Sequence, residues 1–195
     1  MVSQIKVNEI IKQSGSSITI GESGDTISIP SGCTIANSGT ATGFGEDNTP
    51  YFYGQLSANQ TVSNGSNVIA ALDEIEADSA SGWSGASDYK WTCPSGQGGK
   101  YFIGWTFYMG SDTTNSTNWC YSGIKINGSE TDNTVGSLTN SGTSNPSQRL
   151  VASNSIIQTL SAGDYVQLNG VCYVAAGNAR FLSSSGLLIF KVSST

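Results

Sequence analysis

Histidine is absent from this sequence of 195 residues, and with it the commonest general base and metal ligand of enzymes. The Gly-x-Ser-x-Gly turn that presents a serine nucleophile is also missing. Carboxylates cluster only at Asp73, Glu74, Glu76 and Asp78, without the glycine-punctuated loop of a calcium site, which favours a solvated face. These absences predict a protein that is not an enzyme, with no catalytic residue, no metal site and no cofactor.

Charged side chains are also scarce. They make up 11% of the residues, the net charge is −6, and only eight residues are basic. Because so few scattered cations cannot form a positive surface along a phosphate backbone, we expect no nucleic-acid partner. Neutral serine, threonine, asparagine and glycine take the place of the charges and suit strands and turns. The composition therefore predicts an all-β fold.

Long apolar runs are missing too, so we expect no membrane insertion. Residues 1–15 carry Lys6, Glu9 and Lys12 and so lack the uninterrupted apolar core of a secretory signal. The four cysteines, at positions 33, 93, 120 and 172, show no Cys-x-x-Cys spacing, which argues against zinc. Two alternatives stay open for them: buried reduced thiols, or one disulfide within the group Cys93, Cys120 and Cys172.

Residues 1–45 contain a short sequence pattern that repeats. Apolar residues alternate in segments 17–20, 26–29 and 33–35, which predicts three very short strands separated by glycine- and proline-containing turns. Strands of this length cannot bury their isoleucines alone, so successive rungs or neighbouring chains must stack around an axis. We therefore expect a β-repeat stalk that serves for attachment; the alternative is a flexible polar leader.

Residues 46–195 bring aromatic side chains and longer strands, and predict a β-sandwich head. The strongest predicted strand is 100–109: alternate residues from Tyr101 to Met109 form one apolar face, and Phe102 and Tyr108 make the other partly aromatic. One face must meet the opposing sheet, and the other is most simply covered by another subunit. The candidates for core and trimer interface are Tyr101, Phe102, Ile103, Trp105, Phe107 and Tyr108.

One further segment has an ambiguous pattern. Val68, Leu72 and Ile75 follow helical spacing behind a capping residue at Asn67, which favours a helix over residues 68–77. Additional strands are predicted at residues 51–56, 89–93, 119–126, 155–160, 165–174 and 186–192.

Three fragments resemble, in the correct order, parts of the C1q/tumour-necrosis-factor-like (C1q/TNF-like) jelly roll. They are residues 88–94 with the Gly-x-Tyr-Phe at 99–102, the Leu-x-x-Gly-Asp-x-Val-x-Leu hairpin at 160–168, and the closing strand at 186–190, which two extra serines precede. The resemblance covers residues 51–192 and implies a head in which three subunits pack aromatic sheets around a threefold axis. It also places residues 68–75 on an early strand, so helix and strand both stay open there.

Residues 1–45 are similar in style to the opening of short proteins from tailed bacteriophages, with Lys-Val-Asn at 6–8 and Ile-Pro-Ser-Gly-x-Thr-Ile at 29–35. The two resemblances imply a homotrimeric virion structural protein, assembled in the host cytoplasm, that binds other virion proteins through residues 1–45. Its jelly-roll head would belong to a surface fibre, spike or head appendage that recognises the host. The alternatives are a capsid decoration (cement) protein that stabilises the phage head, and a secreted C1q-like lectin or adhesin.

Recognition of a host surface glycan or receptor would fall to polar loops, which carry binding residues on β-sandwich scaffolds. The loop at 111–118 and the strand after it supply the candidates Asn115, Asn118, Trp119 and Tyr121, and residues 127–146 form a second loop.

Large aromatic residues are the side chains that would stack on sugar rings, although we expect at least half of them in the core or in subunit contacts. The aromatic candidates are Trp83, Tyr89, Trp91, Trp105 and Trp119.

Asp164, in a Gly-Asp turn, is expected to accept backbone N–H groups close by.

Overall fold

The structure is a computed structural model that describes residues 10–11, 13–34, 36, 49–112, 117–131, 136–139 and 149–194, with the backbone alone for 136–139. The chain divides into two units, Met1–Thr42 and Gly43–Thr195, which are treated separately. The described part of the second unit, the head, consists of strands and one short 3-10 turn, η1 (Gly85–Ser87). The all-β prediction is thus confirmed, and no helix in the described residues is long and apolar enough to cross a membrane.

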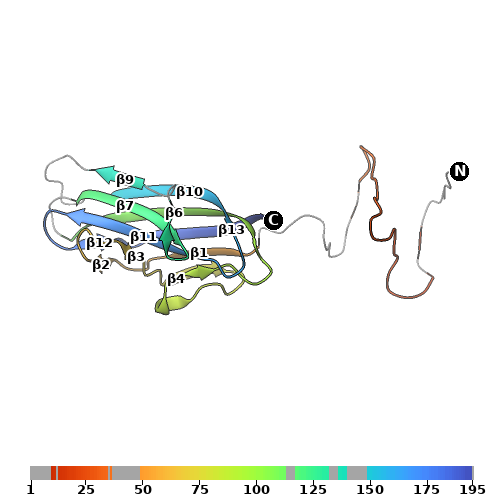
Figure 1. Cartoon of the computed structure of the whole chain (residues 1–195), viewed down its shortest axis with the longest axis horizontal. Helices are drawn as coiled ribbons and strands as arrows, with labels where there is room; N and C mark the ends of the chain where they lie inside the picture. The colour runs from red at the N-terminus through yellow and green to blue at the C-terminus, as the bar shows by residue number, and fades with distance from the viewer. Residues whose placement is uncertain are drawn as a thin grey trace. The chain divides into compact units, whose positions relative to one another are not determined.

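Seven antiparallel strands form the first layer of the head, here called sheet A (Figure 1). They are β1 (Tyr51–Gln55), β2 (Gln60–Val62), β4 (Glu74–Asp78), β6 (Gly99–Ser111), β10 (Leu150–Leu160), β12 (Ala179–Phe181) and β13 (Gly186–Ser194). β10 pairs with β6 along its length, while β13 and β12 share the other edge of β6. β1 continues the sheet from β13, and β4 follows β1.

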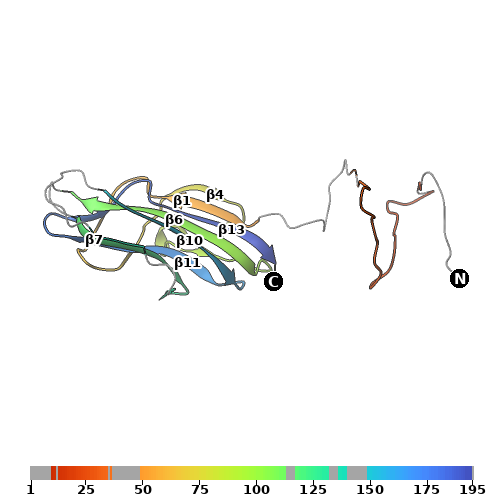
Figure 2. The ribbon, with the colours of Figure 1, turned by 90° about the horizontal axis from the view of Figure 1, so that it is seen from above.

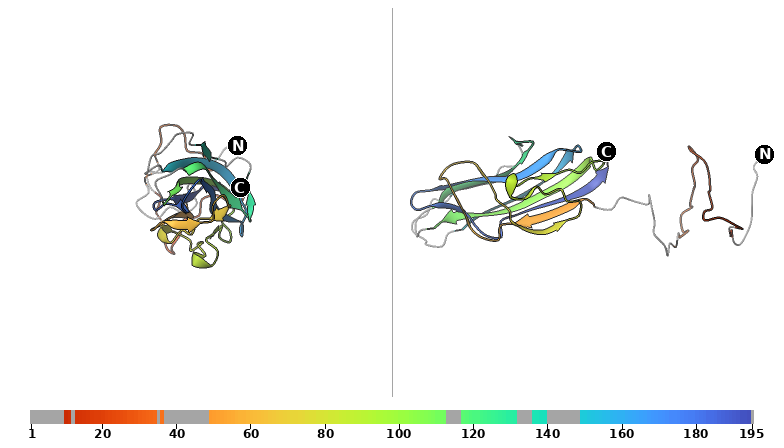
Figure 3. Two further views of the ribbon diagram at one scale, coloured as in Figure 1. Left: turned by 90° about the vertical axis from the view of Figure 1, so that its left-hand side faces the viewer. Right: turned by 90° about the horizontal axis from the view of Figure 1, so that it is seen from below.

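Six strands form the second layer, sheet B. They are β3 (Val68–Ile69), β5 (Trp91–Thr92), β7 (Thr117–Ile126), β8 (Ser129–Glu130), β9 (Gly136–Thr139) and β11 (Tyr165–Val174). β7 and β11 pair antiparallel at its centre. β3 and β5 pair with β11, and β8 and β9 pair with β7. Figures 2 and 3 show the two sheets as the layers of a sandwich.

The core lies between the sheets and is filled by alternate residues of the central strands. Tyr101, Ile103 and Phe107 of β6 are fully buried there, and so is Trp91 of β5, whose ring lies 5.6 Å from that of Tyr101. Val166, Leu168 and Cys172 extend the core along β11. The strict alternation in β6 explains this placement, because successive side chains of a strand point to opposite faces.

The two ends of the head differ. Lys191 N donates to Pro50 O at 3.1 Å, so the chain enters the head beside the last strand. We call this the entry end. At the opposite end β6 finishes at Ser111, β7 begins at Thr117 and β11 finishes at Val174; we call it the tip. Figure 1 shows these two ends at opposite extremes of the sandwich.

The first unit contains the predicted turns but not the predicted strands. Asp25 N donates to Glu22 O at 3.0 Å, and Cys33 N donates to Pro30 O at 3.2 Å, so both turns form. No strand is assigned among described residues 10–36, and the prediction of strands at 17–20, 26–29 and 33–34 is wrong for the single chain; Ile35 lies outside the described residues. The reason is physical: the isoleucines at 18, 20, 27 and 29 are 48–65% exposed, and the described residues of this unit provide no strand to cover them.

Residues 68–77 contain strands β3 and β4 and no helix, as the jelly-roll resemblance implied. The side-chain amide of Gln60 donates to Ile69 O at 3.1 Å and accepts from Ala71 N at 2.9 Å. Ala70 N donates to Leu168 O at 2.9 Å, and Leu72 is buried in the core. These tertiary contacts override the local helical spacing, because the segment passes from sheet B to sheet A.

Candidate functional site

The outward face of sheet A carries a row of apolar side chains that crosses four strands. The pairing places Tyr51 of β1 opposite Phe190 of β13, Phe190 opposite Phe102 of β6, and Phe102 opposite Ile157 of β10. The Phe102 and Phe190 rings stack at 5.0 Å. Tyr51 is 44% and Ile157 64% exposed, so the row ends in two solvent-facing side chains. We call it the apolar row.

Beside the apolar row the same face is hollowed. The next residues across the sheet are Tyr53, Leu188, Gly104 and Ser155. Gly104 and, one pair further, Gly186 line a depression whose sides include Tyr53, Phe102 and Leu188. A second protein surface could insert a side chain into the depression and cover the apolar row. Contiguous exposed apolar surface on a soluble protein is typical of an interaction site.

The six candidates for core and interface divide between the two faces of β6. Tyr101, Ile103, Trp105 and Phe107 are 0–3% exposed inside the single chain. They belong to the core, so this face of β6 meets sheet B and is closed to a neighbouring subunit. Phe102 and Tyr108 are half-buried on the outward face. The sequence could not supply Phe190 and Ile157 as the neighbours of Phe102, because cross-strand register depends on the whole topology.

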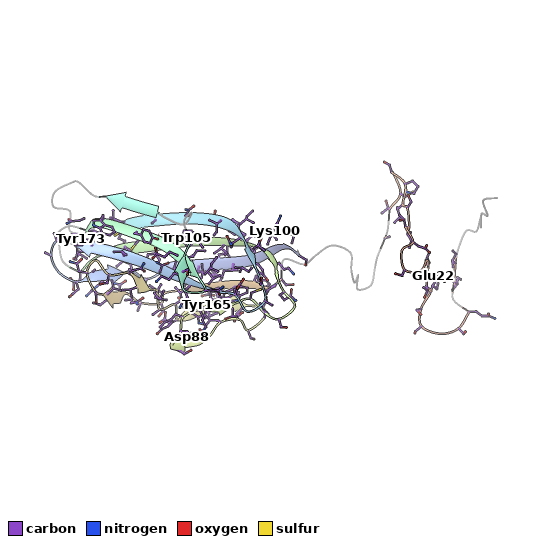
Figure 4. All side chains as sticks on the ribbon, viewed as in Figure 1. Glu22, Asp88, Lys100, Trp105, Tyr165 and Tyr173 are labelled. Carbon is purple, nitrogen blue, oxygen red and sulfur yellow. The ribbon has the colours of Figure 1, made fainter. Side chains whose placement is uncertain are left out.

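The outward face of sheet B carries a second aromatic group near the tip. Trp119 of β7 lies opposite Tyr173 of β11, and their near-parallel rings are 6.0 Å apart at an interplanar angle of 11°. They are 39% and 41% exposed. Figure 4 places Tyr173 at the tip end of β11 and Tyr165 far along the same strand. Trp119 was a candidate from the sequence; Tyr173 was missed, and its outward position in the predicted strand 165–174 was the only signal.

Glu130 accepts hydrogen bonds from three polar side chains on this face. Its carboxylate accepts from Tyr121 OH at 3.0 Å, from Asn169 Nδ2 at 3.2 Å and from Asn67 Nδ2. Asn67 Oδ1 also accepts from Asn169 Nδ2 at 2.9 Å. Burial, followed by the hydrogen bond to Glu130, raises the pKa of Tyr121 to about 12, so its hydroxyl stays a donor at neutral pH. The group Tyr121, Glu130, Asn67 and Asn169 is called the polar cluster below.

The remaining recognition candidates are less well defined. Asn115 lies outside the described residues, and Asn118 is half-buried at the start of β7. Much of the second predicted loop, 127–146, also falls outside them. Its first residue is structural: Asn127 Nδ2 donates to Asp164 Oδ1 at 2.8 Å, and Asp164 Oδ2 accepts from Ser161 N at 2.7 Å. The local role predicted for Asp164 is thus confirmed.

The acidic stretch is engaged in local hydrogen bonds. Asp73 accepts from Ser57 N at 2.8 Å and from the Ser57 hydroxyl at 2.7 Å, and Asp78 accepts from the backbone N–H groups of Gly82 and Trp83. The Ser57 N–H lowers the pKa of Asp73. Among the described residues no group of three or more histidine, cysteine or acidic side chains is placed to hold a metal ion.

Two comparisons with known proteins use the sequence alone and give no match: no protein-family model fits the chain, and no curated protein is similar to it. Solved structures do match by shape. The globular domain of zebrafish complement 1qA aligns with a TM-score of 0.52 at 13% identity, over 75% of this chain and all of that one. Eiger TNF from S. frugiperda aligns with a TM-score of 0.50 at 13% identity, over 74% and 92% of the two chains. The head therefore has the C1q/TNF-like jelly-roll fold.

Proposed function

We propose that this chain is the subunit of a non-enzymatic homotrimer, and that its head is displayed on the surface of a bacteriophage particle for host recognition. The observation that carries the self-association is the apolar row. Tyr51, Phe190, Phe102 and Ile157 form one continuous strip on the outward face of sheet A, where a single chain leaves them in contact with water. Association would remove this strip from water, and apolar burial is the dominant favourable contribution to most protein association.

The three-subunit number comes from the family resemblance, in which aromatic sheets pack around a threefold axis. The first unit supports the same assembly independently. The exposed isoleucines at 18, 20, 27 and 29 lie in short segments that have no partner strand within the described part of that unit, and neighbouring copies would supply one. Residues 1–45 would then also contact other virion proteins.

The virion setting rests on the style of residues 1–45. A capsid decoration protein stays the second candidate, because it too needs a self-associating head and an attachment segment. A secreted C1q-like lectin or adhesin stays the third. Electron microscopy of particles labelled with an antibody to the head separates them: label on tail appendages supports the fibre, label in many copies over the capsid supports the decoration protein, and unlabelled particles contradict both.

Self-association is tested by the mass of the full chain in solution. Sedimentation velocity should give three times the chain mass of 20.2 kDa. Ile157→Ser should weaken the trimer and release monomers, because Ile157 is 64% exposed in the single chain and its loss costs the folded monomer little. Tyr173→Ser is the control, since Tyr173 is also a large exposed side chain, at 41%, but lies on sheet B. A monomeric wild-type chain would contradict the proposal.

A further inference from the structure

The Trp119 and Tyr173 pair forms an aromatic surface that lies outside the core of the head. Both residues face outward from the two central strands of sheet B and keep about two-fifths of their surface in water. The C–H groups on one side of a pyranose ring carry partial positive charge, and the faces of aromatic rings carry negative charge. Exposed, near-parallel indole and phenol rings therefore offer a stacking surface for a sugar.

The Tyr173 side of this aromatic surface is held in place by the turn at Asn64 and Gly65. The side-chain amide of Asn64 donates to Val174 O and accepts from Val174 N, each at 2.8 Å, and Gly65 N donates to Cys172 O at 3.0 Å. A Cβ at Gly65 would lie 3.2 Å from the Tyr173 ring, so the turn packs directly against that ring. Pre-ordered contact residues reduce the entropy that binding must overcome.

The polar cluster lies beside the aromatic pair. Tyr121 follows Trp119 by two residues on the same face of β7, a separation of about 7 Å for an extended strand, and its hydroxyl donates to Glu130. Asn169 is fully buried, and its Oδ1 accepts no hydrogen bond from the described residues although its Nδ2 donates twice. A buried acceptor without a donor is unusual in a folded protein. A water bound between this oxygen and a ligand hydroxyl is the kind of donor that completes it.

Neutral and anionic glycans both combine an apolar ring face with hydroxyl groups, and the charge of the polar cluster discriminates between them. The polar cluster contains one carboxylate, two amides and one phenol and no cation. Lys125 of β7 lies opposite Glu130 of β8, and no ion pair joins the two among the described residues. Glu130 would repel a sialylated or sulfated glycan, whereas its oxygens and the Asn169 oxygen accept neutral hydroxyl groups. The separation of about 7 Å along β7 between Trp119 and Tyr121 favours a ligand of two or more sugars over a single one.

We propose that the tip of sheet B binds neutral oligosaccharides, with one sugar stacked on Trp119 and Tyr173 and the next hydrogen-bonded to the polar cluster. The proposal names the ligand class for the host recognition proposed above and rests on that role only for its biological setting. The site lies on sheet B and the apolar row on sheet A, so glycan binding and the mass of the assembly are separate measurements. Failure of one is therefore distinguishable from failure of the other.

The test is a panel of immobilised glycans probed with the full chain. It contains neutral oligosaccharides of glucose, galactose, mannose and N-acetylglucosamine, together with sialylated and sulfated ones. We expect saturable binding of at least one neutral glycan, confirmed in solution by saturation-transfer NMR. Trp119→Ala and Tyr173→Ala should each weaken that binding by roughly tenfold, the loss expected for one aromatic stacking contact. Trp119→Phe should retain most of it, because the ring face is kept.

Two controls keep the outcome interpretable. Tyr165→Ala removes a tyrosine from the opposite end of β11, at which the ring contacts Lys90, and should leave glycan binding unchanged. Thermal unfolding of every variant identifies loss of binding that comes from loss of the fold. The proposal is overturned if no neutral glycan binds the wild-type chain, if only anionic glycans bind, or if folded Trp119→Ala and Tyr173→Ala bind as well as the wild type.

Discussion

Trp105 of β6 donates its indole N–H to the hydroxyl of Ser122 of β7 at 3.0 Å, and this bond joins the two sheets inside the core. Trp105 is 3% and Ser122 0% exposed, so no water is available to either group. The bond explains the serine at this buried position, because it gives the Trp105 indole N–H an acceptor, whereas the buried Trp91 Nε1 has none among the described residues.

Ser122→Ala should therefore destabilise the head by about 1–3 kcal/mol, the cost of leaving a buried donor unpaired. Urea unfolding followed by tryptophan fluorescence measures the change in the free energy of unfolding. Ser153→Ala is the control, since Ser153 bonds Thr106 at 3.1 Å on the exposed face of sheet A, and its loss should stay within about 0.5 kcal/mol. Equal effects of the two variants would contradict the assignment.

Gly170 of β11 lies where the layers approach closely. A Cβ built on it would lie 2.6 Å from the ring of Phe107 and 3.0 Å from Tyr121 O, and neither atom can move away without displacing a central strand. Gly170→Ala should cost about 1–3 kcal/mol through overpacking, measured as a lower urea midpoint with an unchanged slope. Gly98→Ala is the matched control, because the nearest atom to its Cβ would be 3.5 Å away. A neutral Gly170→Ala would show that the sheets lie further apart than described.

Strand positions followed from the sequence wherever the residues alternate strongly. The predicted strand 165–174 coincides with β11, and the predicted strands 100–109 and 186–192 lie within β6 and β13. β2 and β12 were missed, because strands of three residues have no periodicity to detect. β3 and β4 stayed ambiguous for another reason: Val68, Leu72 and Ile75 follow helical spacing, although the segment forms one short strand in each sheet.

The candidate sites were predicted less well than the strands, because a site depends on which residues lie opposite one another on paired strands. The sequence places Trp119 and Phe102 on strands, yet it does not specify that Tyr173 lies beside the first or that Phe190 stacks on the second. Those neighbours are 54 and 88 residues away, differences that follow from the residue numbers. Likewise the inward or outward direction of Tyr101 and Phe102 depends on which face meets sheet B, and a two-faced aromatic strand does not decide that by itself.

The cysteines provide a chemical check on the fold. The structure leaves all four as thiols: Cys33 is exposed, and Cys93, Cys120 and Cys172 are buried. Burial raises the pKa of Cys93, and the neighbouring Cys172 thiol together with burial raises that of Cys120, so neither forms a reactive thiolate near neutral pH.

Maleimide labelling of the native chain should therefore modify Cys33 alone, as read by intact mass, and labelling in guanidinium should modify all four cysteines. Cys33→Ser removes the native labelling and serves as the control. Four labels on the native chain would mean that the core opens on the timescale of the reaction, and two labels after denaturation without reductant would mean that a disulfide forms.

Stability at low pH should depend on three aspartates that accept short hydrogen bonds. The backbone N–H of Asn178 holds the pKa of Asp112 below its ordinary value, and Ser57 N–H does the same for Asp73. For Asp164 the first cause is the Asn127 amide, followed by Ser161 N–H. In each case the folded pKa lies below the unfolded one, so the stabilisation is present above the unfolded value of about 4 and is lost as the pH falls through the folded value.

The thermal midpoint of the head should therefore be nearly constant from pH 7 to about 5 and fall below about pH 4. Asp164→Asn should lower the midpoint at pH 7 and flatten the fall in acid, because the amide neither attracts the Asn127 donor as strongly nor titrates. The fall should persist in 0.5 M salt, since hydrogen bonds of 2.7–2.8 Å are screened little. A fall that salt abolishes would instead indicate general charge repulsion and would contradict the role given to these carboxylates.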